Sequence, residues 1–128
     1  MSIPKAPQSQ APRRVLIAVP DLFFVTRIRA VAGRVAVAIE ECPLETLAER
    51  CAADAPALVI LDLHAPGDVL ATVRTLKADA RGARIPIVGF YSHVDGETRR
   101  RAIEAGVDHV LPRSAFTARL PELLAGSP

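Results

Sequence analysis

The feature that most constrains the fold of this chain is a regular alternation between short apolar runs and longer amphipathic stretches. Runs such as "VLIAV" (15–19) and "ALVIL" (57–61) contain no polar residue, which is typical of strands covered on both faces. The stretches between them repeat their apolar residues with helical spacing. Strands are predicted at 14–19, 34–40, 57–63, 85–91 and 108–111, and helices at 22–33, 43–54, 68–79, 96–106 and 115–126.

Five consecutive strand–helix units predict an α/β fold of the doubly wound, flavodoxin-like type. In this fold a parallel sheet with strand order 2-1-3-4-5 carries helices on both faces, joined by right-handed crossovers. Gly33 and Gly106 follow the apolar repeats of their helices and are predicted to end them, because glycine tolerates the left-handed conformation found there. Pro121 is expected to bend or restart the last helix.

The length of 128 residues suits one domain, which is long enough to bury a core without disulfides or metals. The segment 1–12, "MSIPKAPQSQAP", is rich in Pro, Gln and Ser and cannot bury enough apolar surface to become ordered. We therefore expect a disordered N-terminal tail over 1–12 and a single domain over 13–128.

Composition excludes several classes of protein. A net charge of +2, with basic residues spread along the chain, is too mild to predict binding to nucleic acid or to an anionic membrane. No apolar run approaches the length of a transmembrane helix, and the N-terminus lacks the apolar core of a signal peptide, so a cytoplasmic protein is expected. Cys42 and Cys51 match no metal or redox spacing and are predicted to be reduced thiols beside a helix.

Polar side chains follow four of the predicted strands. Asp21, Asp62, Tyr91 or Ser92, and Arg113 lie at or just beyond the ends of the first, third, fourth and fifth strands. In sheets of this kind, ligands and reactive groups gather outside the carboxyl ends of the strands. Asp62 is therefore either a reactive carboxylate at this edge or the residue that caps the turn into the following "PGD".

From Arg14 to Gly126 the chain resembles the receiver domains of bacterial response regulators, the phosphoacceptor half of two-component signalling. The stretch "LVILDLHAPGD" is similar to the third strand and following loop of that family, with Asp62 in the phosphoacceptor position. "IPIVGFYS" resembles the fourth strand, and "AIEAGVDHVLPRSAF" resembles the region around the fifth. The resemblance rests on the order and spacing of these motifs along nearly the whole chain.

The resemblance implies a Mg²⁺ site, which the family builds from the acceptor and an acidic pair after the first strand. In this chain the segment reads Val19-Pro20-Asp21. An ungapped match places Pro20 and Asp21 on the pair, and a one-residue gap places Val19 and Pro20 there instead. Because Pro20 offers no side-chain ligand in either case, a Mg²⁺ site at Asp21 and Asp62 is expected to be weak or absent, and no cofactor is certain.

Other family positions are also replaced. The hydroxyl that the family places on its fourth strand corresponds to Tyr91, with Ser92 beside it, and the lysine after its fifth strand corresponds to Arg113. Arginine can still hold a phosphate, but its planar fork needs more room than an ammonium group. Ser114 stands where the family usually has a cis-proline, and Val110 stands at the aromatic switch position.

The residues themselves leave simpler roles open. Asp62 can act as a turn cap, and Asp21 is more readily interpreted as the N-cap of the first helix than as a metal ligand. Arg113 can act as an ion-pair partner of Asp62, since opposite charges at one edge of a sheet stabilise each other without phosphate.

The sequence favours an atypical, stand-alone receiver domain that acts as a protein-interaction module with impaired or absent phosphorylation. The alternative is a functional single-domain response regulator that a histidine kinase phosphorylates on Asp62. A metabolic enzyme is disfavoured because no glycine-rich phosphate loop follows the first strand, so any catalysis is at most autocatalytic phosphotransfer onto Asp62. The expected partner is a histidine kinase or a downstream signalling protein, or a second copy that pairs through a face containing Arg100 and Arg119.

Overall fold

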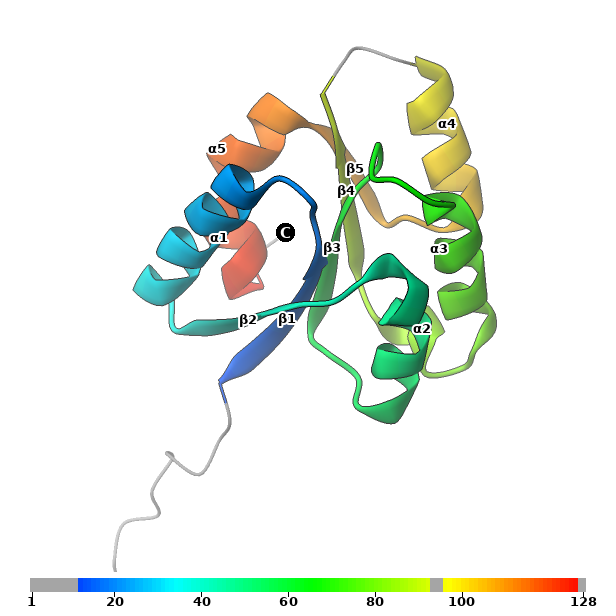
Figure 1. Cartoon of the computed structure of the whole chain (residues 1–128), viewed down its shortest axis with the longest axis horizontal. Coiled ribbons are helices and arrows are strands. Elements are labelled where there is room, and N and C mark those ends of the chain that lie inside the picture. The colour runs from blue at the N-terminus through cyan, green and yellow to red at the C-terminus, as the bar shows by residue number, and fades with distance from the viewer. Residues whose placement is uncertain (1–11, 93–95, 127–128) are drawn as a thin grey trace, which may run out of the picture.

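The computed structural model describes residues 12–92 and 96–126, which form a parallel sheet between two layers of helices (Figure 1). The strands are β1 (Arg13–Ala18), β2 (Val37–Glu41), β3 (Leu58–Asp62), β4 (Ile87–Tyr91) and β5 (His109–Pro112). The helices are α1 (Leu22–Arg34), α2 (Leu44–Ala53), α3 (Val69–Ala78), α4 (Gly96–Ala105) and α5 (Arg113–Ala125), with a short 3₁₀ turn η2 (Gly82–Arg84). Within these residues the five strands are all parallel, in the order β2-β1-β3-β4-β5, which confirms the predicted fold.

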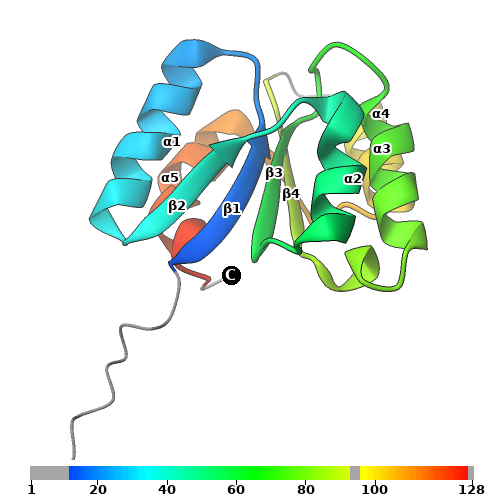
Figure 2. The same ribbon diagram turned by 60° about the horizontal axis from the view of Figure 1, so that its bottom comes forward.

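Both faces of the sheet are buried, because successive strand residues point to opposite sides and both sides carry helices. On the face covered by α1 and α5, the core includes Ile17, Ile60 and Phe116 (Figure 2). On the face covered by α2, α3 and α4, it includes Leu61 and Val73. Polar side chains are therefore displaced to the helix surfaces and to the two edges where strands begin and end.

The cysteines behave as their spacing predicts. Cys42 and Cys51 are free and buried on the α2 side of the sheet. Burial raises the pKa of the Cys51 thiol to about 11, and the neighbouring Cys42 adds to the shift, so this thiol stays protonated and unreactive near neutral pH.

Most boundaries shift by one or two residues from the sequence predictions, and larger differences occur between α1 and β2 and at Pro121. Helix α1 continues through Gly33 to Arg34, so Gly33 does not end it, and the predicted strand at 34–40 begins only at Val37. The left-handed position after α1 falls instead on Ala36, with φ of +58°. Helix α5 runs unbroken through Pro121, so that proline does not restart it.

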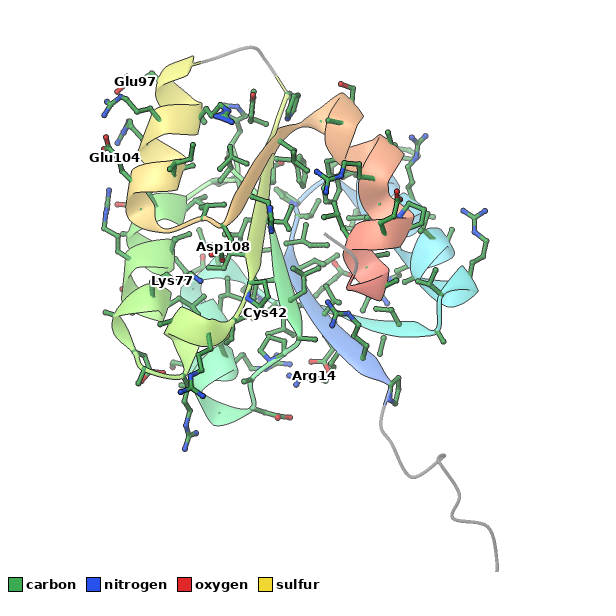
Figure 3. All side chains as sticks on the ribbon, turned by 180° about the vertical axis from the view of Figure 1, so that it is seen from behind. Arg14, Cys42, Lys77, Glu97, Glu104 and Asp108 are labelled. Atoms are coloured by element: carbon green, nitrogen blue, oxygen red, sulfur yellow. The ribbon has the colours of Figure 1, made fainter. Side chains whose placement is uncertain are left out.

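The prediction for Gly106 is correct. It follows α4 with φ of +115°, and an added Cβ would lie 2.9 Å from Cγ of Lys77 on α3. The Lys77 ammonium is bonded to Asp108 at 2.9 Å and to the Ile85 carbonyl at 2.8 Å, which ties α3 to the segments before β4 and β5 (Figure 3). Gly106 therefore has both a conformational and a packing reason to be glycine.

The predicted tail at 1–12 lies outside the described residues, except for Pro12. In the part of the chain that the structure describes, every helix is too short or too polar to cross a bilayer.

Exchanging the residues at positions 33 and 36 is predicted to stabilise the domain at both positions. Ala36→Gly removes a side chain from left-handed backbone, and Gly33→Ala adds a methyl group where nothing lies within 4 Å. Each change is expected to raise the free energy of unfolding by up to roughly 1 kcal/mol, measured by urea denaturation. The matched control is Gly106→Ala, which we expect to lower the free energy of unfolding by more than about 1 kcal/mol. Destabilisation by Ala36→Gly would show that the left-handed turn is not strained.

Candidate functional site

The candidate site lies at the carboxyl edge of the sheet, where Asp62 is the last residue of β3. Asp62 pairs in register with Phe90 on β4. On the other side, Ala18 is the last residue of β1 to pair with β3, opposite Leu61, so the following residue, Val19, is level with Asp62. Asp62 thus emerges where two neighbouring strands also end.

The Asp62 carboxylate organises the turn that follows it. Its Oδ1 accepts a hydrogen bond from the backbone N–H of His64 at 2.9 Å, and its backbone carbonyl accepts one from Ala65 at 3.0 Å. The side chain is partly exposed, and within 12–92 and 96–126 it takes part in no ion pair. The turn-capping role predicted as one of two alternatives is therefore present in the structure, and it leaves the second carboxylate oxygen, Oδ2, outside that hydrogen bond.

Asp21 is the N-cap of α1, as the sequence favours. Its Oδ1 accepts hydrogen bonds from the backbone N–H groups of Phe23 at 3.0 Å and Phe24 at 3.3 Å. These are donors that an uncapped first turn would leave unpaired. The other oxygen, Oδ2, lies 3.1 Å from Nη2 of Arg113, at the start of α5.

Arg113 pairs with Asp21 rather than with Asp62, the partner proposed from the sequence. Among the described residues, its one ion pair is with Asp21. The guanidinium also lies over the ring of Phe24, 4.1 Å from its centroid, and 5.9 Å from that of Phe90. The ion pair and the cation–π contact both direct the cation toward the start of α1.

Beneath this cation lies a cluster of three aromatic rings that the sequence analysis does not identify. Phe24, Phe90 and Phe116 have centroids 4.9–5.7 Å apart and are at most 5% exposed. A signal was present: α1 and α5 open with "DLFF" and "RSAF", so each has a charged residue three positions before a phenylalanine. That spacing puts charge and ring on one helix face.

The ion pair shifts the titration of Asp21. The hydrogen bond from Arg113 holds the pKa of the Asp21 carboxyl below its ordinary value of 3.8, and the backbone N–H of Phe24 acts in the same direction. Asp21 is therefore an ionised carboxylate near neutral pH. Its Oδ1 already accepts from the first turn of α1, and its Oδ2 already accepts from Arg113.

Tyr91 and Ser92 lie apart from this cluster. Tyr91 is 7% exposed and belongs to the core under α2, α3 and α4, together with Val110. Ser92 follows the end of β4 and is exposed. The phenol is thus packed on the opposite side of the sheet from the Phe24 cluster, whereas the serine is exposed to solvent.

The residues present do not fit the magnesium site that the resemblance implies. Level with Asp62 on β1 stands the apolar Val19, followed by Pro20, and Asp21 is held by Arg113. Within the described residues no group of three or more acidic, histidine or cysteine side chains is arranged to hold a metal. Mg²⁺ prefers several oxygen ligands in octahedral geometry, and a guanidinium among them repels the cation.

The pocket at this edge of the sheet lies beside Asp21 and Asp62 and is not lined by either of them. A pocket of about 350 Å³ is lined by the ends of β1 and β2, the start of α2 and the β3–α3 loop. Its walls include Val19, Pro20, Pro43 and Pro66, and Glu41 and Glu45 on its rim are the acidic members. Asp21, Asp62 and Arg113 do not line it, so it is a mostly apolar neighbour of the site.

No family model matches the sequence, and no curated protein matches it. Solved structures do match. The chemotaxis response regulator CheY4 of Vibrio cholerae is 12% identical, with a TM-score of 0.78 over 92% of this chain and 100% of that one. The receiver domain of sensor histidine kinase PA1611 from Pseudomonas aeruginosa, with magnesium in its active-site cleft, is 18% identical, with a TM-score of 0.76 over 91% and 100%.

A third match is the phosphorylated cyanobacterial phytochrome response regulator RcpA, which is 19% identical, with a TM-score of 0.73 over 91% of both chains. Identities this low carry the fold and not the function. The chain therefore has the fold of response-regulator receiver domains.

The Asp21–Arg113 pair predicts a specific dependence of stability on pH. The folded protein binds the Asp21 proton more weakly than the unfolded chain, so the stabilisation is fully present above the unfolded pKa. It is lost as the pH falls through the folded pKa, below about pH 4. Asp21→Asn keeps a capping side chain but removes the charge, and is expected to lower the melting temperature near neutral pH.

The difference in melting temperature between Asp21→Asn and the wild type is expected to close as the pH falls below about 4, measured by circular dichroism. Glu122→Gln, an exposed carboxylate with no ion pair among the described residues, is the control and should show no such convergence. A difference that persists or widens in acid would contradict the assigned role of Asp21.

Proposed function

We propose that this chain is an atypical receiver domain of two-component signalling that works as a protein-interaction module with impaired or absent phosphorylation. The observation that carries the proposal is the Arg113–Asp21 ion pair, together with Val19 and Pro20 where an acidic pair would be needed. An acceptor aspartate needs a cation to neutralise the charge of the incoming phosphoryl group. At this edge of the sheet, Arg113 is instead paired with Asp21.

The comparison structures indicate what such an edge does when its ligands are complete. The PA1611 receiver has magnesium coordinated in its active-site cleft, and the RcpA structure is of the phosphorylated protein. Asp62, the proposed acceptor, is the last residue of β3, but it caps the following turn, and Asp21 at the same edge of the sheet is already paired with Arg113. The module is therefore proposed to have no enzymatic turnover and, at most, slow autocatalytic phosphotransfer onto Asp62.

The alternative function is a response regulator that a histidine kinase phosphorylates on Asp62. One observation favours it: the Asp62 side chain is partly exposed at the strand end and is in no ion pair among the described residues. A kinase could supply binding energy that a small phosphodonor cannot. The two functions differ in whether Asp62 is needed for partner binding.

The proposed partner surface is formed by α4, β5 and α5, for a histidine kinase or a downstream signalling protein, with a second copy as the alternative occupant. The role assigned to Arg100 changes in the structure. It is bonded to Glu97 and, at 2.6 Å, to Glu104 on the same helix, and these carboxylates raise its pKa (Figure 3). Its charge is locally balanced.

The uncompensated charge on this surface comes from other arginines. Arg99 and Arg101 on α4 are exposed, and Arg119 on α5 is partly exposed; none takes part in an ion pair within the described residues. Ile103, 50% exposed, adds an apolar contact point on the same helix. Mixed charge around an apolar centre suits a reversible, salt-sensitive contact.

The phosphorylation proposal predicts the outcome of incubation with acetyl phosphate, followed by intact-protein mass spectrometry. We expect no phosphoryl adduct, or far slower formation than on a receiver with a complete acidic pair treated in parallel, with and without MgCl₂. A rapid Mg²⁺-dependent adduct that Asp62→Asn abolishes would establish the alternative function instead.

The interaction proposal predicts that charge matters at the partner surface and that Asp62 does not. Against a panel of purified histidine-kinase cores, measured by biolayer interferometry, Arg101→Glu combined with Arg119→Glu should weaken any binding by at least about tenfold. Asp62→Asn should change it little, and Arg84→Glu, an exposed charge in η2, is the matched control. If Asp62→Asn abolishes binding and the reversals have no effect, the interaction-module proposal is wrong.

A further inference from the structure

The outward face of α1 exposes large apolar side chains at its first turn. Phe23 is 91% exposed and Leu22 is 71% exposed, and the other exposed large apolar side chain in the described part of the chain is Ile103 on α4. Phe23 begins a stripe of exposed residues at spacings of four, three and four, through Arg27 and Ala30 to Arg34. Such spacing places the four side chains along one helix face.

This stripe, Phe23–Arg27–Ala30–Arg34, is basic as well as apolar. Arg27 and Arg34 take part in no ion pair within the described residues, whereas Arg29 beside them pairs with Glu41 at 3.1 Å. The stripe therefore presents one aromatic ring, one small residue and two free guanidinium groups. A complementary surface needs an apolar pocket, close approach and carboxylates.

Helices α2 and α3 lie side by side (Figure 2), and the hollows lined by residues of both helices form a groove with these properties. It consists of three adjoining hollows: the 350 Å³ pocket at the sheet edge and two hollows of about 270 Å³. The 350 Å³ pocket shares Leu44 and Glu45 with the middle hollow, which Gly67 and Asp68 also line. The middle hollow in turn shares Ala48 and Thr75 with the far hollow, so the three form one channel along the helices.

The α2–α3 groove is acidic, with a floor of small side chains. Glu45, Glu49 and Asp79 line it, and none of them takes part in an ion pair among the described residues. Ala48 and Thr75 form part of the floor, which permits close approach of another helix. At the end of the groove nearest the carboxyl edge of the sheet, the 350 Å³ pocket has apolar walls and enough room for an aromatic ring.

We propose that the stripe of one molecule docks in the α2–α3 groove of a second copy of this chain, with Phe23 in the 350 Å³ pocket and Arg27 and Arg34 facing the groove carboxylates. The lengths agree: the eleven-residue step from Phe23 to Arg34 spans roughly 16 Å of helix, about the length of α2. The two surfaces lie on opposite faces of the sheet, so one molecule cannot satisfy both by itself.

The contact is heterologous, joining two different surfaces, so each bound copy leaves a free stripe at one end and a free groove at the other. It predicts a reversible head-to-tail series whose strength falls with salt, because charge complementarity contributes to it. The inference concerns α1, α2 and α3 and does not depend on phosphorylation of Asp62 or on the α4–β5–α5 surface.

The test uses sedimentation velocity on the full chain over a range of concentrations. Wild-type protein is expected to associate progressively with concentration and to dissociate in high salt. A stripe variant, F23S/R27Q/R34Q, and a groove variant, E45R/E49R, should each be monomeric. Their circular dichroism should be unchanged, because all five side chains are exposed.

An equimolar mixture of the two variants is the decisive arm. The stripe variant keeps an intact groove and the groove variant keeps an intact stripe, so the mixture should form dimers and nothing larger. Arg99→Glu with Arg101→Glu is the matched charge control and should associate like the wild type. The inference is overturned if the wild type stays monomeric at high concentration, if the mixture remains monomeric, or if the α4 reversals abolish association.

Discussion

The rest of this structure depends on the burial of both faces of a parallel sheet. The three central strands, β1, β3 and β4, are buried along most of their length on both sides, so each parallel connection must run through a helix that covers one face. Polar side chains can then remain only on the outer helix surfaces and at the strand ends. This constraint brings Asp21, Asp62 and Arg113 to one edge although they are far apart in the sequence.

At that edge, Arg113 is the cation that the fold fixes in place. Its guanidinium is bonded to Asp21, which caps α1, and it lies over Phe24 above a buried aromatic cluster. This arrangement connects the first turns of α1 and α5, and it places a fixed cation beside the carboxylate that a metal would need. Asp62 is left to organise its own turn.

Most of the fold could be predicted from the sequence, because continuous apolar runs and helical repeats directly record which faces are buried. The positions of Asp62 and Asp21 followed from the same pattern. The partner of Arg113 could not be predicted, since strand order brings both carboxylates to one edge and only the loop paths select between them. Ala36 was missed because its left-handed conformation is imposed by the connection from α1 to β2 and has no glycine to mark it.

The α2–α3 groove could not be predicted either, since it arises from how two helices pack and not from a motif in either one. The central claim, that this edge holds an internal ion pair in place of a metal site, is tested most directly by a MgCl₂ titration followed by ¹⁵N-resolved NMR at constant ionic strength. The account predicts that the amide signals of Phe23, Phe24 and His64, which donate hydrogen bonds to the two carboxylates, show no saturable shift at millimolar Mg²⁺. Saturable shifts of these amides, removed by Asp62→Asn, would contradict it.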